Sequence, residues 1–401
     1  MTKSHLSLLA ATRPGTRRDL YTFYDQFRAA DPCVWDRVLG AWVVTSYELV
    51  SAAAGDARLS SVRYPDPEAV EESLRPVAAV FARQMLYTDP PDHARVRRAV
   101  SASFAARAVE SLRAPIADAV DRILDRVAPR GGMEFVGELA GPLPFDVICT
   151  LLQVPDRDRE QVLAWSGDLA VAFGNARLDA AQKLAASRAA TGLTAYFDGL
   201  LDTPATFLRP GSAVGLTREE VLANAVLLLL AGHETTTHFL GNALFALLGA
   251  PGECARLRAD PALLPRAVEE LLRFESPLQV LWRRAGCDLD LGGRQVRAGD
   301  PVLLVCGAAN RDPAAFDAPH TLDLARAGSR QLAFGHGPHV CAGSALARLE
   351  GEIVLGAVLA RLPGLRPAGP EPTWRPSLNF RGLERLELRW DVPGTAVAGP
   401  G

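Results

Sequence analysis

The segment from Arg218 to Leu248 constrains the fold more than any other part of the chain. Thr217 and Glu220 form the capping-box pattern that begins a helix, and the helical pattern then continues for about 31 residues, or roughly 46 Å. The middle of this segment, residues 225–231, is apolar on every side. Because a helix that is apolar all round must be buried, the sequence predicts a large, mainly α-helical domain around it.

The same segment carries a polar interruption, Gly232-His-Glu-Thr-Thr-Thr-His, in its buried part. Glycine inside a helix costs about 1 kcal/mol relative to alanine, and a buried acid such as Glu234 is costly unless it is paired or hydrated. Thr235 can donate its hydroxyl to the carbonyl of Ala231 and so loosen the helical ladder. Local violations of this kind tend to mark function. Taken alone, however, the motif is better explained as a hydrated patch with structural hydrogen bonds.

A second candidate site is the loop Phe334 to Gly343, which reads Phe-Gly-His-Gly-Pro-His-Val-Cys-Ala-Gly. Glycines at 335, 337 and 343 permit backbone angles that other residues avoid. Cys341 lies directly before the amphipathic stretch Ser344 to Ala360, and a thiol at a helix start meets free N–H groups and the positive end of the helix dipole, which favour the thiolate. These features predict a soft metal ligand facing a planar macrocycle. An ordinary buried cysteine is the alternative.

This loop resembles the haem-binding loop of the cytochrome P450 family, whose form is Phe-Gly-x-Gly-x-His-x-Cys-x-Gly followed by Leu-Ala-Arg, here residues 346–348. The resemblance extends nearly from end to end. It implies the cytochrome P450 fold, a large α-helical domain with small β-sheets and a long central helix over the haem. It also implies haem b (iron protoporphyrin IX) as the cofactor and Cys341 as the iron ligand. Glu234 and Thr235 match the acid and alcohol that deliver protons to iron-bound dioxygen in that family.

Further residues gain a haem-binding role from the resemblance. His93 and Arg97 project from one face of a predicted helix, a pair that would ordinarily be a solvated basic face. The family places this pair against the haem propionates. Arg283, rather than Arg284, occupies the frame of a family strand that reaches a propionate, although a solvated arginine pair is the alternative. The cofactor-binding residues implied are His93, Arg97, Arg283, Phe334, Gly335, His339, Cys341 and Gly343.

Glu270 and Arg273 lie three residues apart on a predicted helix, Pro265 to Phe274. A surface pair at this spacing contributes well under 1 kcal/mol. The spacing also matches the family's Glu-x-x-Arg, a buried structural brace beneath the haem loop. The arginine that often completes this network is replaced here by Thr321, which leaves the third partner open. His320 and Asn310 are candidate replacements.

Composition limits the partners and the location of the protein. A chain of 401 residues without a linker-like break indicates one domain, 1–401, with short mobile tails that include 394–401. The net charge of −3 gives no indication of nucleic acid. The six cysteines form no Cys-x-x-Cys pair, which favours a reduced cytoplasm over a zinc site or disulfide framework. The longest apolar run, Ala223 to Gly232, is half the length that spans a bilayer, and the apolar patch near the N-terminus is too short for a signal or anchor.

Other segments are less informative. The stretch 58–83 is rich in Pro, Asp, Glu and Arg and has little clear period, which predicts an irregular segment. Such a segment either lines a binding site or is a solvated loop. Two helical stretches, 156–173 and 179–201, with a turn near 174–175, correspond to the family's lid over the substrate. Residues 379–383 and 386–390 predict a terminal hairpin, and Cys287 and Cys306 are expected in strands.

The resemblance implies a monomeric haem-thiolate monooxygenase that hydroxylates or epoxidises a mainly hydrophobic small molecule in bacterial secondary metabolism. A separate ferredoxin and ferredoxin reductase would supply electrons by docking on the arginine-rich face near Cys341, and a carrier protein could present the substrate. Oxidative C–C or C–O coupling, or ring formation, is the first alternative. A haem protein that binds a ligand without oxygenating it fits the Glu234–Thr235 pair less well. A haem-free, all-α binding protein would require the motifs to be coincidental.

Overall fold

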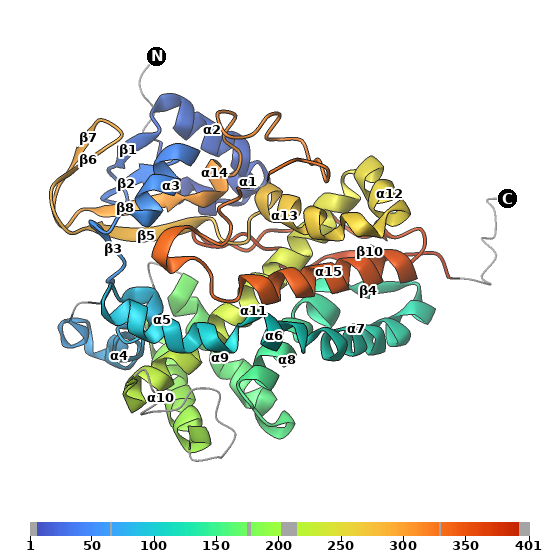
Figure 1. Cartoon of the computed structure of the whole chain (residues 1–401), viewed down its shortest axis with the longest axis horizontal. Coiled ribbons are helices and arrows are strands. Elements are labelled where there is room, and N and C mark those ends of the chain that lie inside the picture. The colour runs from blue at the N-terminus through green and yellow to red at the C-terminus, as the bar shows by residue number, and fades with distance from the viewer. Residues whose placement is uncertain (1–5, 65, 175–177, 202–214, 329, 393–401) are drawn as a thin grey trace.

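The protein is represented by a computed structural model that describes residues 6–64, 66–174, 178–201, 215–328 and 330–392. It is mainly helical with small β-sheets, which confirms the predicted fold class (Figure 1). The helix α11 (Arg218–Leu248) crosses the middle of the molecule with most of its side chains buried. Its predicted capping box is present: the Thr217 hydroxyl accepts from the Glu220 N–H at 3.2 Å, and the Glu220 carboxylate accepts from the Thr217 N–H at 2.9 Å.

Helix α11 separates the two largest hydrophobic clusters. Leu240 and Leu244 belong to one cluster, and Val226 and Leu229 belong to the other. Full burial of a leucine or valine side chain contributes roughly 1.5–3 kcal/mol, so an all-round apolar helix stabilises both halves of the core. The longer helices around it are α5 (Asp92–Ser103), α7 (Arg113–Val127), α8 (Pro142–Leu151), α9 (Arg159–Gly174), α10 (Ala180–Leu201), α12 (Pro251–Ala259), α13 (Leu264–Phe274) and α15 (Ser344–Arg361).

A five-stranded sheet lies beside the N-terminal helices α1 (Pro14–Arg18), α2 (Leu20–Ala30) and α3 (Tyr47–Gly55) (Figure 1). Its strand order is β1-β2-β8-β5-β3, and β2 pairs with β8 in parallel. The strands are β1 (Cys33–Asp36), β2 (Ala41–Val44), β8 (Pro301–Val305), β5 (Val280–Ala285) and β3 (Leu59–Ser60). The smaller sheets are formed by β4 (Gly132–Glu134), β10 (Glu387–Arg389) and β9 (Arg366–Pro367), and by β6 (Leu289–Leu291) and β7 (Arg294–Val296). Strand β5 is the element of these sheets that matters most for the site.

Three local predictions were wrong. The segment 58–83 is not irregular throughout, because it contains β3 and the helix α4 (Arg75–Phe81), whose apolar face packs on α10. The expected terminal hairpin does not form; β10 pairs instead with β4 and β9, which both lie outside the two segments of the predicted hairpin. Neither cysteine lies in a strand: Cys306 begins the short helix α14 (Cys306–Ala309), and Cys287 is exposed in the turn after β5.

Some predictions fall outside the described residues. The turn expected near 174–175 adjoins residues 175–177, and the expected tail at 394–401 belongs to 393–401. Within the described ranges, none of the helices combines the length and the apolar character needed to cross a bilayer.

Candidate active site

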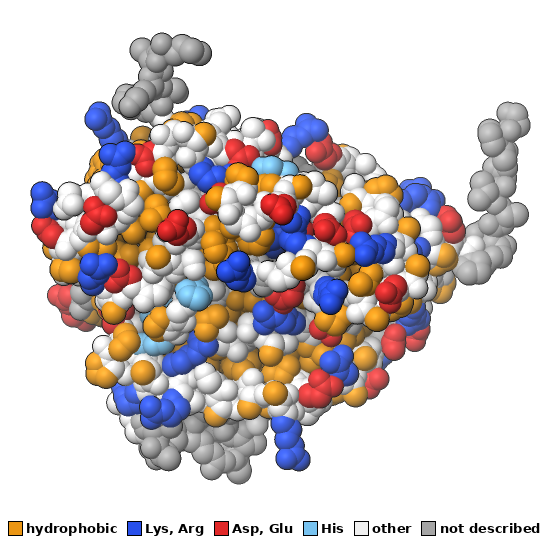
Figure 2. Space-filling model, turned by 45° about the horizontal axis from the view of Figure 1, so that its top comes forward, with side chains coloured by type: hydrophobic (Ala, Val, Ile, Leu, Met, Phe, Trp, Pro, Cys, Tyr) orange, Lys and Arg blue, Asp and Glu red, His pale blue; other side chains and the backbone are white. Residues whose placement is uncertain are grey.

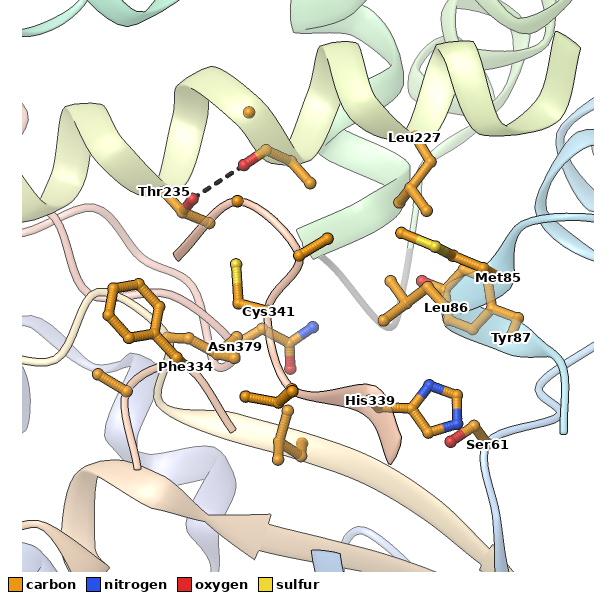
Figure 3. Close-up of a pocket in the computed structure, with 18 of the residues that line it drawn as sticks. Ser61, Met85, Leu86, Tyr87, Leu227, Thr235, Phe334, His339, Cys341 and Asn379 are labelled. Atoms are coloured by element: carbon orange, nitrogen blue, oxygen red, sulfur yellow. Dashed lines mark hydrogen bonds between the residues drawn. The ribbon is translucent and has the colours of Figure 1, made fainter. Parts of the chain in front are cut away.

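A cavity of about 390 Å³ lies between α11, the loop 334–343 and β5. Figure 3 shows the Cys341 sulfur pointing toward α11, with Thr235 on the facing side of the space. The wall formed by Met85, Leu86 and Leu227 is apolar, and these three side chains converge in the same view. The two candidate sites found separately in the sequence therefore face each other across one cavity.

The backbone of the loop brings Cys341 into this position. Gly335 and Gly337 have φ angles of 72° and 74°, in the left-handed region that glycine adopts without strain. A Cβ at Gly337 would lie 2.8 Å from the Cα of Gly55, so the loop packs directly against α3. Gly343 differs: its φ is −89°, which any residue can adopt, so the conformational reason predicted for this glycine was wrong. The Cys341 N–H donates to the Phe334 carbonyl at 2.8 Å and closes the loop.

The electrostatics of the free thiol differ from the prediction. Part of Cys341 is open to the cavity, but burial by the surrounding protein raises the pKa of its thiol. The Gly343 N–H, Arg97 and Arg348 act in the opposite direction without overcoming the loss of hydration. The helix start alone therefore does not make the thiolate the favoured form. A bound metal ion supplies the missing positive charge, because a coordinating thiol is deprotonated outright.

One end of the cavity gathers basic and imidazole side chains from three elements. His93 and Arg97 come from α5, Arg283 from β5, and His339 from the loop. The rings of His93 and His339 are 4.1 Å apart, centroid to centroid. Burial, then His93 and Arg283, lower the pKa of His339 to about 3, and burial and Arg97 lower the pKa of His93. The electrostatic strain of this arrangement would be relieved by an anion.

Arg283 supports the same interpretation. Its Nη1 donates to the Trp282 carbonyl at 2.9 Å, whereas the buried Nη2 has no hydrogen-bond partner among the described residues. Arg284, in contrast, is exposed and donates to the Gly299 carbonyl at 2.9 Å. A thiol facing an open space, and an orphaned guanidinium beside two imidazoles, together fit a haem held through its iron by Cys341 and through its propionates by this end of the cavity.

The polar interruption of α11 divides between two faces of the helix. The Thr235 hydroxyl donates to the Ala231 carbonyl at 2.9 Å, the bond expected from the sequence, and Thr235 lines the cavity (Figure 3). Gly232 permits close packing, because a Cβ there would lie 2.8 Å from Ile148. Glu234 does not line the cavity; burial raises the pKa of its carboxyl, and Arg375 partly opposes this shift. A proton on the Glu234 carboxyl would therefore reach the cavity only by way of the adjacent Thr235 hydroxyl, which lines it.

The Glu270–Arg273 pair is fully buried and bidentate, with both bonds at 2.7 Å. Its third partner is Arg326, whose Nε lies 3.1 and 3.2 Å from the two Glu270 oxygens. His320 instead pairs with Asp25, so this candidate replacement was wrong.

Asn310 joins the same network only through its backbone carbonyl, which accepts from Arg273 at 2.8 Å. Its side chain bonds elsewhere, to Ser276 and to the Leu332 N–H. The sequence held one indication that Arg326 is the third partner. It lies five residues after Thr321, and Thr321 occupies the position where the family often has an arginine. The pairing itself requires the folded chain.

Glu350 is a cavity residue that the sequence interpretation missed. It lies on α15, is 1% exposed, and its Oε2 has no hydrogen-bond partner among the described residues. Burial raises the pKa of its carboxyl to about 8. Helical spacing could have indicated its position, because Glu350 lies four residues after the buried Leu346 and shares its face.

Replacement of Glu350 by glutamine is expected to remove a pH-dependent loss of stability. The pKa of about 8 lies above the ordinary value of 4.5, so between these values the folded state keeps a proton that the unfolded state releases. The free energy of unfolding of the unmodified protein should therefore fall as pH rises through this window, by up to about 1.4 kcal/mol per pH unit, and level off above it. Denaturant titrations at stepped pH measure this slope. An unchanged slope in Glu350→Gln would contradict the assignment, and Glu371→Gln serves as the exposed-carboxyl control.

Comparison with known proteins gives extended similarities. A family model described as Cytochrome P450 matches residues 200–365. The biotin biosynthesis cytochrome P450 of Bacillus subtilis is 37% identical over 382 residues, covering 92% of this chain and 96% of that protein. The 6-deoxyerythronolide B hydroxylase of Saccharopolyspora erythraea is 34% identical over 397 residues, covering 93% of this chain and 96% of that protein. The crystal structure of P450BioI in complex with hexadec-9Z-enoic acid ligated acyl carrier protein matches with a TM-score of 0.90 at 36% identity, covering 94% of this chain and 100% of that one.

Proposed function

The chain belongs to the cytochrome P450 family, and we propose that this monooxygenase uses haem b to hydroxylate or epoxidise a mainly hydrophobic small molecule in bacterial secondary metabolism. The observation that carries the proposal is the Cys341 thiol facing Thr235 across a cavity whose far end is basic. When bound, the haem supplies dioxygen activation assisted by electron donation from its thiolate ligand. The 6-deoxyerythronolide B hydroxylase is, by its name, a hydroxylase, which supports the choice of reaction.

The protein's own residues would bind and orient the cofactor. Cys341 would provide the sulfur ligand of the iron, and His93, Arg97, Arg283 and His339 would provide donors for the two carboxylates. Charge-assisted hydrogen bonds from arginine to carboxylate are among the strongest in proteins. The guanidinium carbon of Arg348 lies 4.5 Å from the centroid of the Phe334 ring, so these two side chains pack together. Glu270 and Arg273 act structurally by holding the segment beneath this loop.

Glu234 and Thr235 would move protons. The Thr235 hydroxyl lines the cavity and can turn from the Ala231 carbonyl toward a bound molecule. Glu234 is held largely out of water, and this burial raises the pKa of its carboxyl, so it keeps a proton more readily than an exposed carboxyl does. The exposed Arg375 is the charged side chain that acts on Glu234, and it partly opposes the effect of burial on the pKa of that carboxyl.

Thr235→Ala is expected to uncouple electron consumption from product formation. Removing the hydroxyl removes the proton donor that lines the cavity, so product formed per NADPH should fall at least about tenfold while peroxide rises. Parallel assays of product, peroxide and NADPH measure the ratio. Thr237→Ala is the matched control, because the Thr237 hydroxyl donates to the His233 carbonyl and lies away from the cavity. If Thr235→Ala formed as much product per NADPH as the unmodified protein, the proposed role of Thr235 in proton transfer would be contradicted.

The electrons would come from a separate ferredoxin and its reductase in the cytoplasm, acting on a monomer. The six free cysteines support a reducing compartment. Figure 2 shows basic side chains interspersed with acidic ones on the face that it presents. P450BioI was crystallised with an acyl carrier protein, so a carrier-bound substrate is also compatible with this fold.

Reconstitution tests the proposed function. The purified protein is titrated with macrolides, aromatic polyketides, terpenoids and steroids, and ligands that shift the Soret band are carried into turnover with ferredoxin, reductase and NADPH. Incorporation of label from isotopic dioxygen into product is the expected result. Ligand binding without oxygenation of any ligand would favour a binding protein, and turnover with NADPH alone would contradict the need for a separate partner.

A further inference from the structure

The cavity contains an arginine that is separate from the haem-binding end. Arg63 follows β3 and lines the cavity, where its guanidinium carbon lies 5.4 Å from the Trp282 ring centroid and 5.7 Å from that of Tyr64. It also interacts with the Tyr87 hydroxyl. In the part of the chain that the structure describes, Arg63 has no carboxylate within ion-pair distance, unlike Arg58 and Arg75 on either side of it in the sequence. The aromatic rings therefore hold this cation in place without neutralising it.

The strand β5 separates Arg63 from the haem-binding end. Successive side chains of a strand point to opposite faces, so Trp282 points away from the face that presents Arg283. Trp282 packs against the N-terminal hydrophobic cluster, and Arg63 lies over its ring. Arg63 and the haem-binding end therefore lie against side chains from opposite faces of β5, although both line the one cavity. Two propionates on the Arg283 side would leave Arg63 without an anion.

A second donor lies next to Arg63. Asn379 lines the cavity and accepts from the Trp282 indole N–H through its Oδ1 at 2.7 Å. Because this bond occupies the amide oxygen, the NH₂ group of Asn379 is the part of the amide that can donate to a ligand. No acceptor for that NH₂ group is found among the described residues. Figure 3 shows the Asn379 amide among the cavity side chains. Arg63 and Asn379 are therefore both joined to Trp282 and both offer N–H donors.

We propose that Arg63 and Asn379 bind the carboxylate of an amphipathic acid, whose apolar part lies against Met85, Leu86 and Leu227. The proposal rests on the proposed function, because it names the substrate class of the same cavity. An arginine fork matches the two oxygens of a carboxylate, which a lysine or a neutral donor does not. The apolar wall accounts for the remainder of the ligand, and a free acid rather than a neutral thioester is the form that these donors select.

The test uses the haem-loaded protein and dodecanoic acid, with methyl dodecanoate as the neutral counterpart of equal chain length. Affinities are measured by the Soret shift and by calorimetry. The acid is expected to bind at least about tenfold more tightly than the ester, the range of one charge-assisted hydrogen bond in a protein. Arg63→Gln should remove this difference while leaving the affinity for the ester unchanged, and Arg63→Lys should restore part of it.

Arg75→Gln is the matched control, because Arg75 is an exposed arginine of the same segment that pairs with Glu68 at 3.7 Å. This variant should retain the preference for the acid. The proposal would be overturned if the unmodified protein bound the acid and the ester with equal affinity, or if Arg63→Gln lost affinity for both ligands equally. In either case an intact haem-thiolate spectrum would leave the proposed function standing. Tight binding of the dodecanoyl thioester of N-acetylcysteamine, equal to that of the acid, would likewise overturn it. A protein that does not bind haem would overturn both.

Discussion

Cys341→Ala is expected to eliminate the spectrum of a thiolate-ligated haem and all oxygenation. The sulfur of Cys341 is the only cysteine sulfur that lines the cavity in the described part of the chain, so no neighbouring thiolate can replace it. The basic end of the cavity is unchanged in this variant, so some haem should still bind without the thiolate. The carbon monoxide spectrum of the reduced protein, together with a haem assay, separates the loss of ligation from the loss of haem.

The control for this experiment is Cys287→Ala. Cys287 is also exposed, but it lies in the turn after β5 and away from the cavity. Its substitution should leave the spectrum and the haem content unchanged. If Cys341→Ala kept the thiolate-type spectrum, or if Cys287→Ala lost it, the assignment of the iron ligand would be wrong.

Arg273→Ala is expected to lower the free energy of unfolding by about 3–5 kcal/mol, the largest stability effect that we predict. The substitution leaves the buried Glu270 carboxylate with only Arg326 and the Asp323 N–H among the described residues, and it also removes donors from the Asn310 and Pro319 carbonyls. A carboxylate that loses its main partner in the interior retains its desolvation cost without compensation. Urea denaturation of the purified protein, followed by circular dichroism, measures the change.

Two further variants isolate the charge effect. Replacing both Glu270 and Arg273 by methionine removes the unpaired charge along with its partner, and should cost less than Arg273→Ala alone. Arg326→Met should also cost less, because Glu270 keeps its two 2.7 Å bonds to Arg273. A loss below about 1 kcal/mol for Arg273→Ala would show that the pair behaves like a surface ion pair, in contradiction to its burial.

Local patterns in the sequence were sufficient to predict much of the fold and part of the site. The bounds of α11 follow from a capping box and an unbroken apolar run, both of which are read within a few residues. The bond from Thr235 to Ala231 spans one helical turn, and the angles of Gly335 and Gly337 follow from the absence of a Cβ. Each of these features depends on neighbours in the chain, and that is why the residue order alone reveals them.

The features that the sequence did not determine depend on contacts between distant segments. Arg326 reaches Glu270 from 56 residues away, Arg63 lies over Trp282 from another element, and β10 pairs with β4 across most of the chain. Glu350 acquires its raised pKa only when other helices exclude water from it. Burial and pairing are properties of the assembled interior, since the free energy of a charge depends on which groups surround it. The sequence therefore determined the long helix α11 and the loop that carries the thiol, and the tertiary structure decided how the strands pair and which charges are paired, buried or left open to a ligand.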